Sequence, residues 1–328
     1  MKMRTVVLLS IGFFLLRFSS YALGAEAGEG AEEKRPAETI LVEKGGVLLP
    51  KGALVIEPAL KYSHFSRHRM SISGFTILEA IVIGEIAVSD VKRDIVEFSL
   101  TGRYGVTSRF EVEAKVPYMY RHDREVRGPG TATVSEHTIG DHGLGDIEGA
   151  LYYHLIKEKG WVPDVVVNLR VKAPTGRDPY DLDVEDGRYK ELPTGNGHWG
   201  ISGGFTAVKT SDPAVFFAGI NYYWNIERDV GKEFGKVDPG DSIEYNLGIA
   251  YALSERVSLS TSFQQRFTMK TTQNGDDVPG TFMNVATLFL GMSYSLSKKT
   301  YLNVNVGIGL TVDAPDVQVS VSIPIRLL

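Results

Sequence analysis

Ser202 stands in a run that matches the pattern around a catalytic serine. The run Gly200-Ile-Ser-Gly-Gly204 fits the G-x-S-x-G signature, in which a sharp turn between a strand and a helix exposes the nucleophile. No helical pattern follows it, and residues 198–210 alternate between small or polar side chains and larger apolar ones. We therefore expect Ser202 to lie within a strand. A hydrolase that uses Ser202 with a histidine such as His154 or His198 remains an alternative hypothesis.

A second candidate for chemistry is a cluster of histidine and aspartate residues. Asp141 and His142 are adjacent, and His137 and Asp146 lie nearby in the sequence. Imidazole nitrogens and carboxylate oxygens are ligands for divalent cations. Polar loops also carry such groups as solvated side chains. We expect a solvated loop here, with no metal and no cofactor.

The largest group of candidate residues consists of charged and polar side chains at every second position of several segments. Alternation places them on one face of each strand, opposite an apolar face. Ions enclosed in a narrow cavity carry a large desolvation cost, so we expect most of them to pair across strands, with solute selectivity as a second role. The candidates are Glu57, Lys61, Glu97, Arg103, Glu111, Glu113, Lys115, Arg121, Glu148, His154, Asn168, Arg170 and Lys172.

The elements that carry these residues have a period of two, which is typical of β-strands. In 317–327 the odd positions are all aliphatic, and the even positions are Gln318, Ser320, Ser322, Pro324 and Arg326. A soluble sandwich would present long charged side chains to water on its polar face. Here the polar faces of the C-terminal segments hold mainly Gly, Ser, Thr, Asn and Gln, which suits a crowded lumen, while the apolar faces suit lipid.

Short turns alternate with long polar loops along the chain, as in an up-and-down barrel with short periplasmic turns and long external loops. The pattern predicts an all-β, transmembrane, antiparallel barrel of about twelve strands. The predicted strands are 54–66, 91–105, 108–123, 142–157, 161–174, 197–210, 213–228, 241–254, 256–270, 282–296, 299–312 and 316–328.

Residues 75–89 are apolar but fall in the first external excursion. Three alternatives stay open for them: a plug, an extension of the flanking strands, or an additional strand pair. The last would raise the number of strands to fourteen.

The N-terminus predicts export. Lys2 and Arg4 precede an apolar run of about 12 residues, too short for the ~20 that a membrane-spanning helix requires, and small residues follow up to Gly24. We expect a cleaved signal peptide at 1–24, a flexible segment at 25–47, and the barrel at 48–328. A chain exported in this way would reach the Gram-negative outer membrane.

Composition excludes several classes of protein. The chain has 328 residues and no cysteine, which removes disulfide frameworks, thiolate metal sites and cysteine nucleophiles. The formal net charge is -5, so no electrostatic argument supports a nucleic-acid partner. The expected partners are outer-membrane lipid and a small-molecule solute, and the oligomeric state stays open.

Six short blocks occur in a fixed order along the chain. The blocks are Leu49-Pro-Lys-Gly52, Glu57-Pro-Ala-Leu-Lys-Tyr-Ser63, Arg103-Tyr-Gly-Val-Thr-Ser-Arg-Phe-Glu-Val-Glu113, Val116-Pro-Tyr118, Gly143-Leu-Gly-Asp-Ile-Glu148 and Lys172-Ala-Pro-Thr-Gly176. This ordered set resembles the outer-membrane family named for the MetA pathway of phenol degradation. The resemblance implies a barrel with a transport role. It does not imply a catalytic site. It does not specify phenol as the solute.

The function predicted from the sequence is therefore a non-enzymatic outer-membrane channel or transporter. Small aromatic or apolar solutes would pass by passive diffusion through a charged constriction, gated by 75–89 or by the loop 176–197. A hydrolase that uses Ser202 and a non-conducting structural barrel are the alternatives.

Overall fold

A computed structural model describes residues 46–73, 85–127, 135–182, 184–185, 188–231 and 234–327. Nearly all regular structure in these residues is β, and a short 3₁₀ helix, η1 (Pro179–Asp181), is the exception. In the part of the chain just defined, no helix has both the length and the apolar character needed to cross a membrane.

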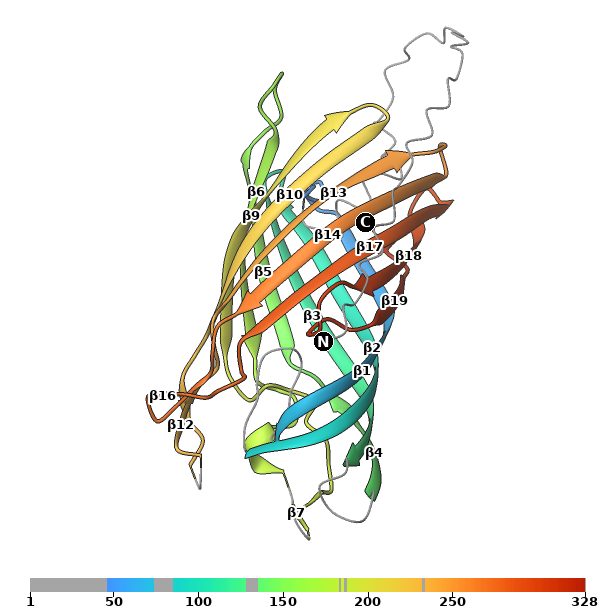
Figure 1. Ribbon diagram of the computed structural model, residues 1–328. Coiled ribbons are helices and arrows are strands. Elements are labelled where there is room, and N and C mark those ends of the chain that lie inside the picture. Colours follow the sequence, from blue (N-terminus) through green and yellow to red (C-terminus); the bar gives the residue numbers. More distant parts are fainter. Residues whose placement is uncertain are drawn as a thin grey trace, which may run out of the picture. The chain divides into compact units, whose positions relative to one another are not determined.

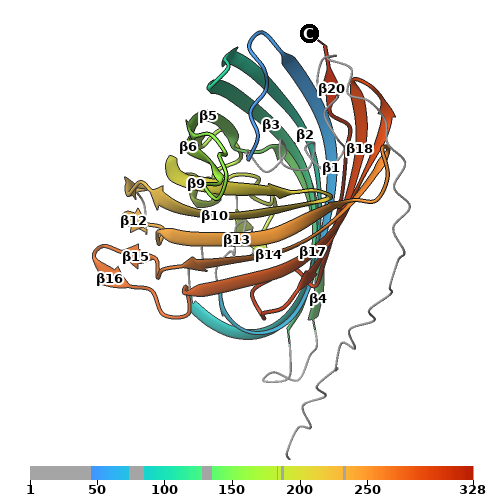
Figure 2. The ribbon, with the colours of Figure 1, turned by 90° about the horizontal axis from the view of Figure 1, so that it is seen from above.

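The strands form one closed antiparallel barrel, confirming the predicted twelve-stranded architecture. Neighbours in sequence are neighbours in the wall, and the ends of the sheet meet because β18 pairs with both β17 and β19, and β19 pairs with β1 (Figures 1 and 2). The wall consists of β1 (Leu54–Ser73), β2 (Glu85–Thr107), β3 (Phe110–Arg127), β5 (Ile147–Ile156), β6 (Asp164–Ala173), β9 (Gly200–Ser211), β10 (Ala214–Asn225), β13 (Ser242–Ala252), β14 (Val257–Thr268), β17 (Met283–Ser297), β18 (Thr300–Gly309) and β19 (Val317–Ser322).

Two of the predicted strands are interrupted. The predicted strand 142–157 covers the end of β4 (Ser135–Leu144) and all of β5, and the break lies opposite Pro117 of β3. The predicted strand 316–328 consists of β19 and β20 (Ile325–Arg326), with Pro324 in the break. Proline has no N–H group, so it cannot donate to the hydrogen-bond ladder, and the ladder lacks one bond at both places, although Gly145 N still donates to Pro117 O and Tyr301 N to Pro324 O.

The first hairpin is longer than predicted. β1 and β2 pair from Leu54↔Tyr104 to Ser73↔Glu85, so 85–89 prolong a flanking strand, which is one of the alternatives left open for 75–89. Residues 75–84 lie outside the described residues. The turns between strands at one end of the barrel are short (108–109, 157–163, 212–213, 253–256 and 298–299), and we call this the short-turn end.

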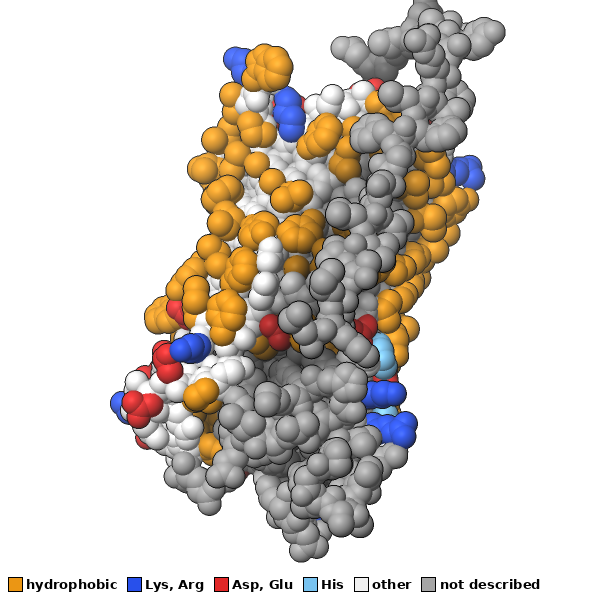
Figure 3. All heavy atoms as spheres, viewed as in Figure 1, with side chains coloured by type: hydrophobic (Ala, Val, Ile, Leu, Met, Phe, Trp, Pro, Cys, Tyr) orange, Lys and Arg blue, Asp and Glu red, His pale blue; other side chains and the backbone are white. Residues whose placement is uncertain are grey.

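Alternation separates the two faces of the wall. On β2, Phe98 and Leu100 are 51% and 45% exposed on the outer face, whereas Glu97, Ser99 and Thr101 are buried on the inner face. Hydrophobic side chains dominate the visible outer surface of the barrel (Figure 3). Because a soluble protein rarely exposes so continuous an apolar surface, the outer face is suited to hydrocarbon.

Residues 46–53, which we call the inner segment, precede β1 and pack against the inside of the wall. Val47 contacts a buried cluster that includes Val208 and Phe217, and Leu48 packs against Tyr152 and Val166. Only Gly46 and Val47 of the predicted flexible segment 25–47 are among the described residues.

A tight turn anchors the inner segment to the β2–β3 end of the wall. Gly52 N donates to Gly105 O at 2.7 Å, and Gly105 N donates to Ala53 O at 2.9 Å. A Cβ atom at position 105 would lie 2.2 Å from Pro50 O, so only glycine allows the backbones to approach this closely.

The opposite end carries the long loops. Residues 192–198 are buried, and β11 (Arg228–Asp229), β12 (Lys236–Asp238), β15 (Thr272–Gln273) and β16 (Asp276–Asp277) form a small separate sheet. Tyr180 and Val237 make a buried contact between this sheet and the loop that precedes β9. Among the described residues, part of the long-loop end is therefore covered by packed chain.

Candidate functional site

A network of buried ion pairs crosses the inner wall from β1 to β6. Arg103 Nε lies 2.9 Å from Glu113 Oε2, and Arg103 Nη2 lies 3.8 Å from Glu57 Oε2. Arg170 connects the next strands, with Nη2 2.9 Å from Glu113 Oε1 and Nη1 2.6 Å from Glu148 Oε2. We call these five residues the central network. Each guanidinium bridges carboxylates on two strands, so the network ties neighbouring strands together.

Tyr152 extends the central network toward the apolar part of the lumen. Its hydroxyl accepts from Arg170 Nη2 at 2.8 Å and donates to Glu113 Oε2 at 3.3 Å. Glu111 is also buried, and its Oε2 accepts from Leu49 N at 2.7 Å. The inner segment is thus bonded to the same charged wall.

Two further ion-pair groups flank the central network. Glu97 lies between Lys61 and Lys115, with N–O distances of 3.2 and 2.8 Å. Lys172 lies 3.3 Å from Asp146, a carboxylate that also accepts from Gly176 N and Asn196 N. The second group therefore joins the inner wall to the loop over the long-loop end.

The remaining sequence candidates lie apart from this assembly. Arg121 is buried beside Asp123, at 2.6 Å, and its Nη1 atom has no hydrogen-bond partner. His154 lies near the short-turn end, with Nε2 2.8 Å from Asp164 Oδ1. Asn168 is half-buried on β6, in register with Tyr152 on the neighbouring strand. Most of the thirteen candidates thus contribute to neighbouring ion pairs, and these three do not join the central network.

A second charged group was not expected from the sequence. Arg266 Nη2 lies 2.6 Å from Glu244 Oε2, and the Arg266 guanidinium stacks 4.4 Å from the Tyr223 ring centre. Tyr223 interacts electrostatically with Arg170 and Glu148 of the central network. The C-terminal half of the lumen is therefore charged as well as polar. The sequence did contain a signal for this ion pair: Glu244 is the one charged residue of β13, Arg266 is the one charged residue of β14, and both are at inward positions.

The inner wall becomes apolar toward the short-turn end on β5, β6, β9, β10 and β13. We call this region the apolar collar, and the inner segment packs against it with Val47 and Leu48. Its residues are Ala150, Tyr152, Val166, Val208, Val215, Phe217 and Ala250. On β14, β17 and β18 the inward side chains near the same end are polar, among them Ser258, Ser293 and Asn303. The charged wall is thus followed by apolar side chains on one side of the lumen.

Ser202 lies within β9, as expected from the alternation, and not at a strand-to-helix turn. It is buried, and its register partners are Arg170 and Tyr223. Nε2 of His154 is bonded to Asp164, and both ring nitrogens of His198 are bonded to other groups. No histidine that contacts Ser202 is found among the described residues.

The histidine and aspartate residues weighed as a metal site lie on or beside β4 and not in the expected loop, and their aspartates point to different partners. Asp141 Oδ2 accepts from Leu192 N at 2.8 Å and pairs with Arg177. Asp146 instead pairs with Lys172 and accepts hydrogen bonds from backbone N–H groups of the loop. His142 stacks on Tyr118. Within the described ranges, no three His, Asp or Glu residues are placed to hold a metal ion.

His198 and Tyr180 connect the long loop to the barrel rim. His198 Nδ1 donates to Ile226 O at 2.9 Å, and Nε2 accepts from the Tyr180 hydroxyl at 2.9 Å. This arrangement requires a neutral imidazole. Burial lowers the pKa of His198 to about 4, and burial also raises the pKa of Tyr180, so the hydroxyl keeps its proton.

We expect acidification to loosen this loop. An unfolded histidine titrates near ~6.5, so the closed loop is fully stabilised above that pH and loses stability as the pH falls toward the folded pKa of about 4. The loss is at most about 3 kcal/mol. The protection factors of the amides in 192–198, which correct for the slowing of intrinsic exchange in acid, should fall at acidic pH, and His198→Gln should remove this dependence over that range. Protection factors that do not change with pH would contradict this prediction.

The comparisons with known proteins identify the family. The family model described as "Putative MetA-pathway of phenol degradation" matches residues 54–327. The chain belongs to this family. The resemblance stated from the sequence blocks is thereby confirmed.

Solved structures share the barrel fold. The COG4313 outer membrane channel from Pseudomonas putida F1 is 15% identical, with a TM-score of 0.60 over 86% of this chain and 97% of that chain. The toluene transporter TodX from Pseudomonas putida is 10% identical, with a TM-score of 0.41 over 85% and 89% of the two chains. The translocator domain of the autotransporter NalP from Neisseria meningitidis is 9% identical, with a TM-score of 0.41 over 88% and 94%.

Proposed function

We propose that this member of the family is a Gram-negative outer-membrane channel through which small apolar or aromatic solutes pass by passive diffusion. One observation carries the proposal: the inside of the barrel contains a collar of buried apolar side chains, occupied by Val47 and Leu48 of the chain itself. A porin for polar solutes has a polar, water-filled lumen. An apolar collar instead favours solutes with apolar surface.

The charged wall and the coverings at the two ends give the mechanism. A solute would pass the loop 176–197 at the long-loop end and then the belt formed by Glu97, Arg103, Glu111, Glu113 and Arg170. It would finally displace the inner segment from the apolar collar. The pairing of the ions supports this path. An apolar solute that passes a charged group displaces water from it, and this desolvation costs less when the charge is already paired.

Transport through the lumen requires no cofactor and no catalytic residue. The nitrogen partners of His154 and His198 support a non-enzymatic role, because neither ring is turned to activate Ser202. The fold shared with the COG4313 outer membrane channel supports a channel role by analogy of fold.

Flux into liposomes tests the proposal. Vesicles that contain the purified chain should take up small aromatic hydrocarbons faster than protein-free vesicles, and faster than they take up sugars of similar size. A planar bilayer should show conductance steps in the same preparation. A correctly assembled barrel without flux or conductance, over several voltages and solutes, would overturn the proposal and favour the non-conducting structural alternative. Hydrolysis of an ester that is lost in Ser202→Ala would favour the enzyme.

A further inference from the structure

The hairpin between β5 and β6 extends beyond its neighbour at the short-turn end (Figure 1). β3 pairs with β5 only as far as Phe110↔Tyr153, and the last backbone bond runs from His154 N to Arg109 O. The hairpin continues to a turn at Gly160 and Trp161, closed by two 3.1 Å backbone bonds between Lys159 and Val162. Its tip therefore stands clear of the wall on that side.

The tip is rigid because several bonds brace it. Lys209 Nζ of β9 lies 2.5 Å from Glu158 Oε1 and 2.5 Å from Gly160 O. Glu158 Oε2 accepts from Thr210 N at 3.2 Å, and Glu158 N donates to Asp164 Oδ1 at 2.6 Å. The backbone of the tip is therefore held in place and is not a loose loop.

This braced tip displays apolar and basic side chains together. Trp161 is 97% exposed, and Leu155, Ile156 and Val162 are exposed beside it. Lys157 and Lys159 are exposed as well. An indole held fully in water loses the stabilisation that burial would give, whereas tryptophan and lysine at a bilayer surface contact headgroups and phosphates favourably.

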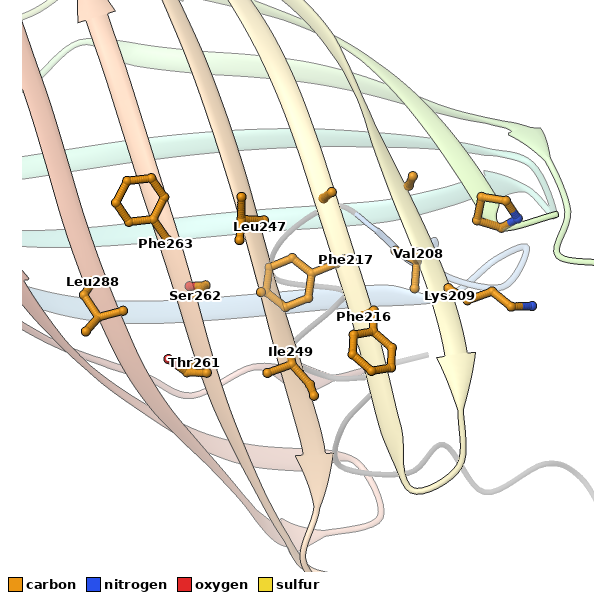
Figure 4. Close-up of a pocket in the computed structure, with 14 residues that line it drawn as sticks. Val208, Lys209, Phe216, Phe217, Leu247, Ile249, Thr261, Ser262, Phe263 and Leu288 are labelled. Carbon is orange, nitrogen blue, oxygen red and sulfur yellow. The ribbon is translucent and has the colours of Figure 1, made fainter. Parts of the chain in front are cut away.

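An apolar groove of about 670 Å³ begins beside this tip, at Pro163 and Lys209. It continues across the outer positions of β10, β13 and β14, where Phe216, Leu247 and Phe263 contribute side chains (Figure 4). Ala207 and Ala218 face each other in register between larger neighbours, so the small side chains deepen this part of the outer surface. The groove is thus apolar along its length and has a lysine at the short-turn end.

We propose that the β5–β6 tip and this groove form a specific site for one anionic phospholipid of the periplasmic leaflet. Short turns face the periplasm in barrels of this architecture. An acyl chain would lie in the groove, and the phosphate would lie against Lys157 and Lys159, with Trp161 at the level of the headgroups. The inference rests on the membrane location of the barrel and is independent of which solute it carries.

Quenching of Trp161 fluorescence tests the site. The chain has three tryptophans, so Trp199→Phe with Trp224→Phe leaves Trp161 as the sole indole. The full chain in detergent is titrated with phosphatidylglycerol brominated on its acyl chains, and with brominated phosphatidylcholine for comparison. We expect saturable quenching that is tighter for phosphatidylglycerol, and protection of Trp161 from aqueous iodide once the lipid is bound.

Matched variants separate the parts of the site. Lys157→Gln with Lys159→Gln should weaken phosphatidylglycerol binding roughly 10- to 30-fold, whereas Lys298→Gln with Lys299→Gln, on another short turn, should not. Ala218→Phe should fill the groove and abolish saturable quenching, whereas Ala114→Phe, exposed on β3 outside the groove, should leave it unchanged.

Three results would overturn the proposal. One is full quenching by iodide with none by either lipid, and another is equal affinity for both lipids with no effect of the lysine changes. The third is a dimer that Ala218→Phe dissociates, which would make a second copy of the chain the occupant. Solute flux measured on the same variants reports separately on the proposed transport function.

Discussion

Replacing Leu48 with aspartate should raise the conductance of the barrel sharply. Leu48 is buried against Ala150, Tyr152 and Val166 in the apolar collar. A carboxylate there would lose its hydration without gaining a cation, at a cost of several kcal/mol. The inner segment would then leave the collar. Every ~1.4 kcal/mol lost from the free energy with which the inner segment packs in the collar raises the ratio of open to closed barrels about tenfold.

Single-channel recording measures this change directly, as open probability in a planar bilayer. Lys51→Asp is the matched control, because Lys51 is exposed on the same segment and its replacement adds the same carboxylate without burying it. We expect the control to behave as the unmodified chain does. Equal effects of the two substitutions on open probability would show that the charge of the inner segment controls opening and that the packing of Leu48 in the apolar collar does not.

A covalent lock supplies the converse test of the same gate. The chain has no cysteine, so Leu48→Cys with Val166→Cys introduces one pair, at residues that pack in one cluster. Oxidation should hold the inner segment in the collar and stop flux, and reduction should restore it. Flux that is unaffected by redox state, in protein shown to be cross-linked, would mean that the inner segment is a permanent part of the wall and that solutes pass beside it.

The sequence predicted the wall of the barrel well because each strand has one face toward hydrocarbon and the other toward a polar lumen. Such a strand has little freedom to shift its register. A shift of one residue would turn Glu97 toward hydrocarbon, at the cost of desolvating its carboxylate. It would also move the Phe98 ring from hydrocarbon into the polar lumen. The ends of strands were less predictable. The break opposite Pro117 depends on which strand lies beside this proline, and this is a property of the pairing. Pro324 interrupts its own strand, although the alternation of residues 317–327 continues through it.

The inner segment was not predictable from local pattern. Its apolar residues Val47, Leu48 and Leu49 follow no period, and their partners lie on strands far away in the chain. The burial of residues 192–198 was missed for a similar reason. Their polar side chains predict an exposed loop, but backbone N–H groups of Gly176 and Asn196 donate to the distant Asp146 carboxylate and hold this loop against the barrel. Contacts that depend on distant partners leave almost no signal in a single sequence.

Removing the charge of Arg103 should destabilise the assembled barrel more than removing any exposed lysine. Arg103 is buried between Glu113, at 2.9 Å, and Glu57, at 3.8 Å. In Arg103→Met these carboxylates would remain buried with less compensation. Losing one partner of a buried ion pair costs roughly 3–5 kcal/mol. The fraction that migrates as a folded barrel on unheated gels, followed against urea, measures the loss.

Lys61→Met is the matched control for this effect, because it removes a positive charge from the same inner wall. The Lys61 side chain is 42% exposed, and its partner Glu97 keeps Lys115 at 2.8 Å. A loss of only about 0–1 kcal/mol is expected there. Adding Glu57→Gln to Arg103→Met should recover part of the stability, because the uncompensated carboxylate is then neutral. If the two methionine variants were equally stable, the central network would contribute no more than surface charges do, and its ions would be better explained by the solute that passes them.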